Sequence, residues 1–260
     1  MGNLKTAKDT VLTDLIGITD AAYPGDPAGT NANKAYFETN VHNYIKDGAI
    51  ALQPARKYQV HPDFSSLGNP FFANVATAFA QAKADGSSSS DKAEIDIKGK
   101  NSSYTDALTL DATGGYIVFK GGGLYNNVIA GIITITAGSY AFKNCKITAN
   151  IVQSGGVAEF LNCIQKGANT AQQGSSTLMI ADCPHWGYIA LSGNSNNFFL
   201  QGVRYMEKNG SNYSLVLSNS MTGGVYEIAD VDMGGDIDDS GSLITRRKNV
   251  DINVTTRPTL

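Results

Sequence analysis

From residue 93 onward the chain is a series of short apolar or alternating runs, separated by Gly, Asn, Asp and Ser. Examples of these runs are AEIDIKG, DALTLDA, GYIVFKG and NNVIAGIITITAG. Runs of this kind, bounded by turn-forming residues, are typical of β-strands. The pattern therefore predicts an all-β region.

A four-residue pattern, apolar-x-(Asn/Asp/Gly)-small, recurs within this region about every 20 residues. It is FKGG at 119–122, FKNC at 142–145, FLNC at 160–163, IADC at 180–183, LQGV at 200–203 and IADV at 228–231. Self-similarity at such a period indicates stacked coils rather than a sandwich or a barrel. Neither a leucine-rich repeat nor a strict hexapeptide repeat is present, and coils of unequal length favour a right-handed parallel β-helix.

Stacked coils place equivalent residues ~4.8 Å apart, so that similar side chains form ladders along the axis. A small, soft, buried thiol suits a tight interior corner of such a stack. The Asn and Asp that precede the cysteines are expected to satisfy backbone groups at a turn. The predicted core ladder consists of Phe142, Phe160 and Ile180, with Cys145, Cys163, Cys183 and Val203 at the corner.

The sequence predicts that the chain consists of two parts. Residues 1–69 are an irregular, turn-rich extension with one short amphipathic helical pattern between Phe37 and Gly48. Residues 70–260 are the β-helix, opened by a helix over residues 70–85 that covers the apolar end of the first coil. The signals for this helix are a cap at Asn69, Pro70 at the first position, a stop at Gly86, and an apolar stripe of Phe72, Val75, Phe79 and Ala80.

Composition narrows the possible functions. The net charge is −3, so no broad basic surface is offered to nucleic acid. No apolar run approaches the ~20 residues of a membrane span, and the start of the chain has no secretory signal. The three cysteines lack a CxxC or zinc-like spacing, which indicates reduced thiols from a reducing compartment. No metal site and no cofactor are predicted.

Three consecutive segments of the chain resemble a known family. PFFANVATAFAQAKADG, then AEIDIKGKNSSYTDALTLDATGGYIVFKGGG with a turn at Gly99 to Tyr104, then GIITITAGSYAFKNCKI, is similar to the opening of pectin-lyase-like right-handed β-helix proteins. Within that group the chain is most similar to bacteriophage tail spike, fibre or baseplate-associated proteins. The resemblance implies a homotrimer made in the bacterial cytoplasm and incorporated into the virion tail. It also implies that residues 1–69 attach to other virion proteins while the β-helix projects outward.

Enzymes of this fold would need groups that the sequence offers only as candidates. A polysaccharide lyase uses a basic residue beside carboxylates, for which Arg204, Glu207 and Asp232 are candidates. A glycoside hydrolase needs two carboxyl groups on one face, such as Glu159 and Asp182. The acidic stretch DVDMGGDIDD at 230–239 does not fit a calcium-binding EF-hand and is expected to be a solvated loop.

One loop supplies candidate contacts to a glycan. CPHWGY places His185, Trp186 and Tyr188 directly after a core position, where a proline interrupts the strand. Aromatic rings in such a turn can stack on sugars, or they can be buried between coils or between subunits. Both interpretations stay open, and with them three functions. The chain is expected to be a non-enzymatic structural or receptor-binding tail component, and the alternatives are a polysaccharide lyase or hydrolase and a carbohydrate-binding module.

Overall fold

The structure is a computed structural model that describes residues 56–64, 69–98, 102–124, 127–193, 196–218, 224–239, 244 and 246–252. The helical pattern expected between Phe37 and Gly48 lies outside the described residues. The compact unit that contains the strands begins at Arg56. Its first strand, β1 (Lys57–Val60), pairs in parallel with β3 (Ala93–Ile97). The expected boundary at 69/70 therefore moves to 55/56, because β1 belongs to the β unit.

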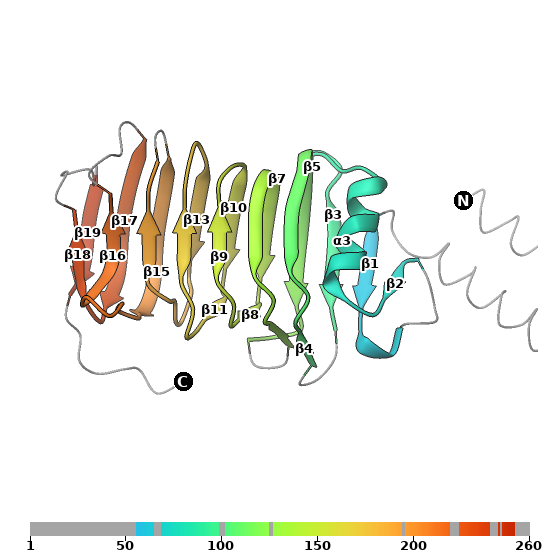
Figure 1. Cartoon of the computed structure of the whole chain (residues 1–260), viewed down its shortest axis with the longest axis horizontal. Coiled ribbons are helices and arrows are strands. Elements are labelled where there is room, and N and C mark those ends of the chain that lie inside the picture. The colour runs from blue at the N-terminus through green and yellow to red at the C-terminus, as the bar shows by residue number, and fades with distance from the viewer. Residues whose placement is uncertain are drawn as a thin grey trace, which may run out of the picture. The chain divides into compact units, whose positions relative to one another are not determined.

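Within the described residues, parallel strands form a 15-stranded sheet and a 4-stranded sheet. The strands lie side by side along the long direction of Figure 1, from β1 at the N-terminal end to β18 and β19 at the C-terminal end. The expectation of an all-β unit is confirmed. The arrangement is consistent with a solenoid, because neighbouring strands are far apart in sequence yet pair in one direction.

The strands belong to three stacks. The first contains β1, β3, the C-terminal halves of β5 (Leu108–Gly121) and β7 (Ile133–Lys143), then β10 (Val157–Leu161), β13 (Thr177–Ala181), β15 (Asn197–Met206), β17 (Val225–Met233) and β19 (Arg246–Asp251). The second contains the N-terminal halves of β5 and β7, then β9 (Ile151–Gln153), β12 (Thr170–Gln172), β14 (Ile189–Leu191), β16 (Tyr213–Leu217) and β18 (Asp236–Asp238). The third contains β4 (Ser102–Tyr104), β6 (Asn127–Ile129), β8 (Lys146–Ile147) and β11 (Ile164–Gln165).

The chain visits these stacks in turn, so each passage adds one layer. β9, β10 and β11 follow one another in sequence, and β12 and β13 then pair with β9 and β10. In the third stack, an isolated parallel bridge between Ile164 and His185 continues the series beyond β11. The apolar core lies between the stacks, because alternate side chains of most strands point inward.

The predicted core ladder is present. Phe119, Phe142, Phe160, Ile180 and Leu200 are successive register partners in the first stack. The ring centroids of Phe119 and Phe142 are 4.6 Å apart with an interplanar angle of 8°, and those of Phe142 and Phe160 are 4.9 Å apart at 10°. The repeated sequence pattern therefore marks one position in each layer.

The Asn and Asp of the repeat occupy a second ladder, at the corner of the layers. Asn144, Asn162 and Asp182 have φ values of 55°, 50° and 55°, a conformation that these residue types tolerate better than most others. The side-chain nitrogen of Asn162 donates to Oδ1 of Asn144 over 2.7 Å. The backbone N–H of Asn162 donates to the carbonyl of Ala181 in the next layer. These residues therefore satisfy turn geometry, as expected from the sequence.

The three cysteines form the interior of this corner. Cys145, Cys163 and Cys183 are buried free thiols, and Val203 takes the equivalent place in the next layer. Sγ of Cys163 donates to the carbonyl of Phe142 over 3.3 Å. A hydrogen bond with Cys163 and burial raise the pKa of Cys145 well above its ordinary value, and burial raises the pKa of Cys183. Little thiolate, the reactive form, is therefore present at Cys145 and Cys183 at neutral pH.

The thiols are predicted to resist labelling in the native protein. Ellman's reagent at pH 7.5 should modify Cys145, Cys163 and Cys183 slowly in buffer and rapidly in guanidinium chloride, because reaction requires both access and thiolate. As a positive control, the exposed variant Thr136→Cys should react within seconds under native conditions. Rapid native modification of all three wild-type thiols would contradict the buried ladder.

The N-terminal helix differs from its expected bounds. The helix α3 covers Val75–Ala84, and Oδ1 of Asn74 caps it by accepting from the backbone N–H of Thr77 over 2.8 Å. The residues before it form a 3-10 turn, η1 (Pro62–Phe64), and a short strand, β2 (Phe71–Phe72), which pairs with β1. The predicted start at Pro70 is wrong because the backbone of Phe71 and Phe72 joins the sheet instead.

The apolar side of α3 also differs in part from the expected stripe. Val75 and Phe79 are buried as expected, whereas Ala80 is exposed and Ala78 and Ala82 are buried in its place. The helix packs against β1, β3 and β5 at the N-terminal end of the stack (Figure 1). Gly86 follows the helix with a φ of 70°, as the predicted stop requires.

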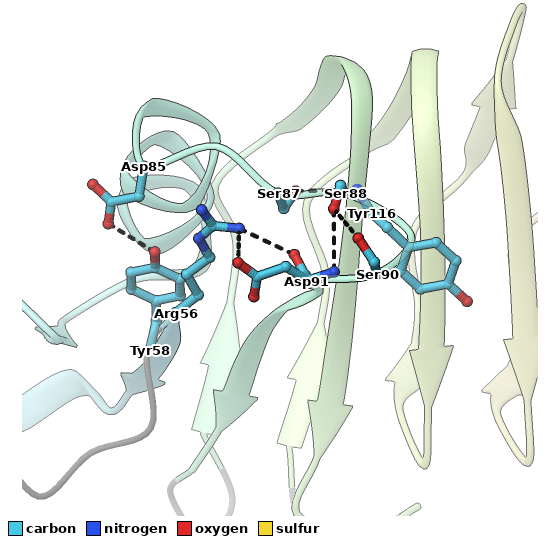
Figure 2. A network of polar contacts seen from close by, with 8 residues as sticks. All are labelled: Arg56, Tyr58, Asp85, Ser87, Ser88, Ser90, Asp91 and Tyr116. Atoms are coloured by element: carbon cyan, nitrogen blue, oxygen red, sulfur yellow. Dashed lines mark hydrogen bonds and ion pairs between the residues drawn. The ribbon is translucent and has the colours of Figure 1, made fainter.

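A polar network fastens the segment after α3 to the first strands, as Figure 2 shows. The hydroxyl of Tyr58 on β1 donates to Oδ2 of Asp85 over 2.7 Å. Arg56 forms an ion pair with Asp91. On the other side, the backbone N–H of Tyr116 on β5 donates to Oγ of Ser87 over 3.0 Å. The network thus links β1, the end of α3 and β5 at the start of the stack.

Candidate functional site

A groove of about 180 Å³ lies on the outer side of the first stack, over β15, β17 and β19. Its polar and aromatic lining comes from three neighbouring strands. The lining residues are Phe199 and Gln201 on β15, Glu227, Ala229 and Asp230 on β17, and Arg246 and Lys248 on β19, with Leu200 and Ile228 beneath.

Strand register brings these residues together. Phe199 pairs with Glu227, which pairs with Arg246, so these three side chains form one row across the layers. Gln201, Ala229 and Lys248 form a second row in the same way. The residues between the rows, Leu200 and Ile228, are buried in the core. The short side chain of Ala229 leaves the depression between its two longer neighbours.

The charges of the groove lie in two parallel strips. Glu227 and Asp230 on β17 form an acidic strip, and Arg246 and Lys248 on β19 form a basic strip beside it. Asp230 lies at a corner with a φ of 56°, and its Oδ1 accepts from the side-chain nitrogen of Asn249 over 2.7 Å. Within the part of the chain that the structure describes, the side chains of Glu227, Arg246 and Lys248 form no hydrogen bond or ion pair. Charged groups of both signs therefore line the groove side by side.

The aromatic loop CPHWGY at 183–188 does not form a surface site for sugars. Trp186 is fully buried, its ring packs on Phe160 with centroids 5.1 Å apart, and its Nε1 donates to Thr170. His185 is also buried. A glycan contact through Trp186 or His185 is therefore wrong, because neither side chain presents a face to solvent. Tyr188 is half-buried and accepts a hydrogen bond from the side chain of Asn169.

The structure joins two residues that the sequence assigned to different sites. Nε2 of His185 and Oε1 of Glu207 are 2.8 Å apart. The other carboxylate oxygen of Glu207 accepts from the backbone N–H of Gly167 over 3.1 Å. Gly167, His185 and Glu207 come from three successive layers, so the carboxylate connects these layers at the corner. We assign Glu207 a structural role on this geometry.

The other candidate catalytic residues are not joined into a site. Among the described residues, no hydrogen bond or ion pair connects Arg204 or Asp232 with Glu207. Glu159 accepts from the hydroxyl of Tyr116 and lies opposite Met179, three positions before Asp182 in the next layer. The two proposed hydrolase carboxylates therefore occupy different rows.

Within the described ranges, no three His, Cys, Asp or Glu side chains cluster as metal ligands would, and the residues of the 230–239 stretch that are described are no exception. None of the helices in this part of the chain combines the length and the apolar character needed to cross a bilayer.

Comparison with known proteins gives no match to a family model, to a curated protein or to a solved structure. The groove is therefore interpreted from its own residues. The sequence analysis missed three of these residues, Phe199, Gln201 and Glu227. Each of them directly flanks a repeated apolar position, Leu200 or Ile228. Aligning the outward neighbours of each repeat, as well as the repeats themselves, would have placed them in common rows.

The two hydrogen bonds that Glu207 accepts, from His185 and from the backbone N–H of Gly167, are predicted to stabilise the fold. Glu207→Ala should lower the free energy of unfolding by ~1–3 kcal/mol, because the nearly buried His185 and the N–H of Gly167 both lose their acceptor. Glu207→Gln should lose less, since it keeps one acceptor oxygen. The measurement is urea unfolding followed by circular dichroism.

Asp232→Ala is the matched control, since Asp232 is half-buried and has no side-chain partner within the described residues. It should change the free energy of unfolding by about 0.5 kcal/mol or less. Equal losses for Glu207→Ala and Asp232→Ala would contradict the proposed connection between layers.

Proposed function

We propose that this chain is a non-enzymatic, receptor-binding component of a phage tail that contacts a surface polysaccharide of the host through the groove over β15, β17 and β19. In this proposal the stacked strands close into a right-handed parallel β-helix, and three copies associate. The segment before the β unit attaches to other virion proteins. The chain is made in the bacterial cytoplasm and functions in the virion tail.

The observation that carries the binding function is the composition of the groove. It combines an aromatic residue, an amide, two carboxylates and two cations within one concave surface built on strands. Binding sites for small polar ligands use such a mixture, with an apolar wall for contact area and a few polar groups for orientation. The phage-tail setting is supported by the resemblance of residues 70–240 to pectin-lyase-like β-helix proteins.

A second function on the same fold is favoured by one specific observation. Glu227 and Asp230 line the same groove, and hydrolysis of a glycosidic bond uses two carboxyl groups that flank the bond. A polysaccharide-degrading enzyme is therefore the alternative. It differs from the binding function in a measurable way, because it would release new reducing ends that Glu227→Gln abolishes.

Filling the groove is predicted to abolish polysaccharide binding. In affinity electrophoresis through gels that contain surface polysaccharides extracted from bacteria, the full chain should be retarded by at least one of them. Ala229→Trp should migrate as in an empty gel, because the indole would occupy the depression at the centre of the groove. Circular dichroism of both proteins checks that the variant is folded.

Ala181→Trp is the matched control. Ala181 stands in the same outward row as Ala229, two layers away and outside the groove, so this variant should be retarded like the parent. Failure of every polysaccharide to retard the parent, or equal retardation of both variants, would contradict the proposal. Light scattering on the same samples should give three times the 27.5 kDa chain mass, and a monomer would contradict the trimer.

A further inference from the structure

We propose that the groove recognises a sugar ring that carries an anionic group, with the anion on Arg246 and Lys248 and the sugar hydroxyls on Glu227. The inference rests on the proposed glycan-binding function and adds the chemical class of the ligand. The shared chemistry is a pyranose with either a carboxylate or a phosphate monoester.

The basic strip supplies the anion site. Arg246 and Lys248 stand two positions apart on β19, so their side chains leave the same side of the strand. Both are exposed, and neither has a hydrogen bond or ion pair to any described residue. Charge-assisted hydrogen bonds from a guanidinium and an ammonium group are among the strongest contacts available to a carboxylate or a phosphate.

The acidic strip determines that the ligand also carries hydroxyl groups. Glu227 is the register partner of Arg246, so a ligand anion on Arg246 would lie about one strand spacing, ~4.8 Å, from the row of this carboxylate. An ionised carboxylate only accepts hydrogen bonds, and hydroxyl groups are suitable donors for it. Because two acidic and two basic residues line the groove, a bare inorganic anion gains little net attraction. A hydroxylated ring that bears an anion satisfies both strips.

The aromatic wall of the groove suits a sugar ring. Phe199 precedes Glu227 and Arg246 in the same row, so the aromatic side chain is about two strand spacings, ~10 Å, from the cation. A pyranose placed between them would pack its C–H groups against the ring of Phe199.

The test is an NMR titration of the full chain with four probes: glucose, glucuronate, glucose 6-phosphate and inorganic phosphate. At least one of the two anionic sugars should bind about tenfold or more tightly than glucose, a difference typical of a hydrogen bond to a charged group. It should also bind more tightly than inorganic phosphate. The tighter of the two anionic sugars distinguishes a uronic acid from a phosphorylated sugar as the natural unit.

Substitutions on β19 test whether the anionic group of the ligand binds to Arg246 and Lys248. Arg246→Gln and Lys248→Gln should each reduce the affinity for the anionic sugar toward that for glucose. Arg247→Gln should leave it unchanged, because Arg247 lies on the same strand but does not line the groove.

Three results would overturn the inference: equal binding of glucose and both anionic sugars, binding of none of the probes, or equal effects of Arg246→Gln and Arg247→Gln. These outcomes differ from a failure of the proposed function. If Ala229→Trp still abolished retardation by a polysaccharide, the groove would bind a glycan without recognising an anion.

Discussion

The structure depends on one constraint, which is that each layer hydrogen-bonds to the next in parallel register. The backbone N–H of Ile164 donates to the carbonyl of Cys145 in the preceding layer, and that of Arg204 donates to Cys183. Such bonds fix the position of every residue relative to its equivalents above and below. Similar side chains must then stack, as the rings of Phe142 and Phe160 do at a centroid distance of 4.9 Å. A change of residue type within a ladder therefore alters the packing against both adjacent layers.

The same constraint produces the groove. Register brings residues that are far apart in sequence into one row on the outer surface. Phe199 on β15, the acidic strip on β17 and the basic strip on β19 therefore lie side by side. In the row that contains Ala229, the neighbouring side chains are a Gln and a Lys, and the short alanine makes the surface concave. A binding site built on paired strands is held more firmly than one built on loops. β15 and β17 are each fixed by two neighbouring strands, and β19 is fixed by β17.

Sequence reasoning predicted what the repeat itself encodes. The FKNC, FLNC and IADC segments identified the stacked core and the corner turns, since identical positions in a parallel stack require similar residues. The start of α3 was placed too early because Asn69-Pro70 and Asn74 both offer a helix start, and pairing of Phe71 with β1 decides between them. Trp186 was open to two interpretations because periodicity does not show whether a ring after a proline turns inward. The groove was not predicted, because its residues share no motif and meet only through register.

The central claim is tested most directly by distances between spin labels introduced as an unnatural amino acid at Glu94, Glu159 and Glu227, whose side chains belong to one outward row. Glu159 lies three layers from each of the others, so pulsed electron resonance should give about 14 Å between backbone positions for either adjacent pair and about 29 Å for Glu94 and Glu227. Distances that increase in proportion to the number of layers would support the stack. A distance between Glu94 and Glu227 that is no longer than the two shorter ones would contradict it.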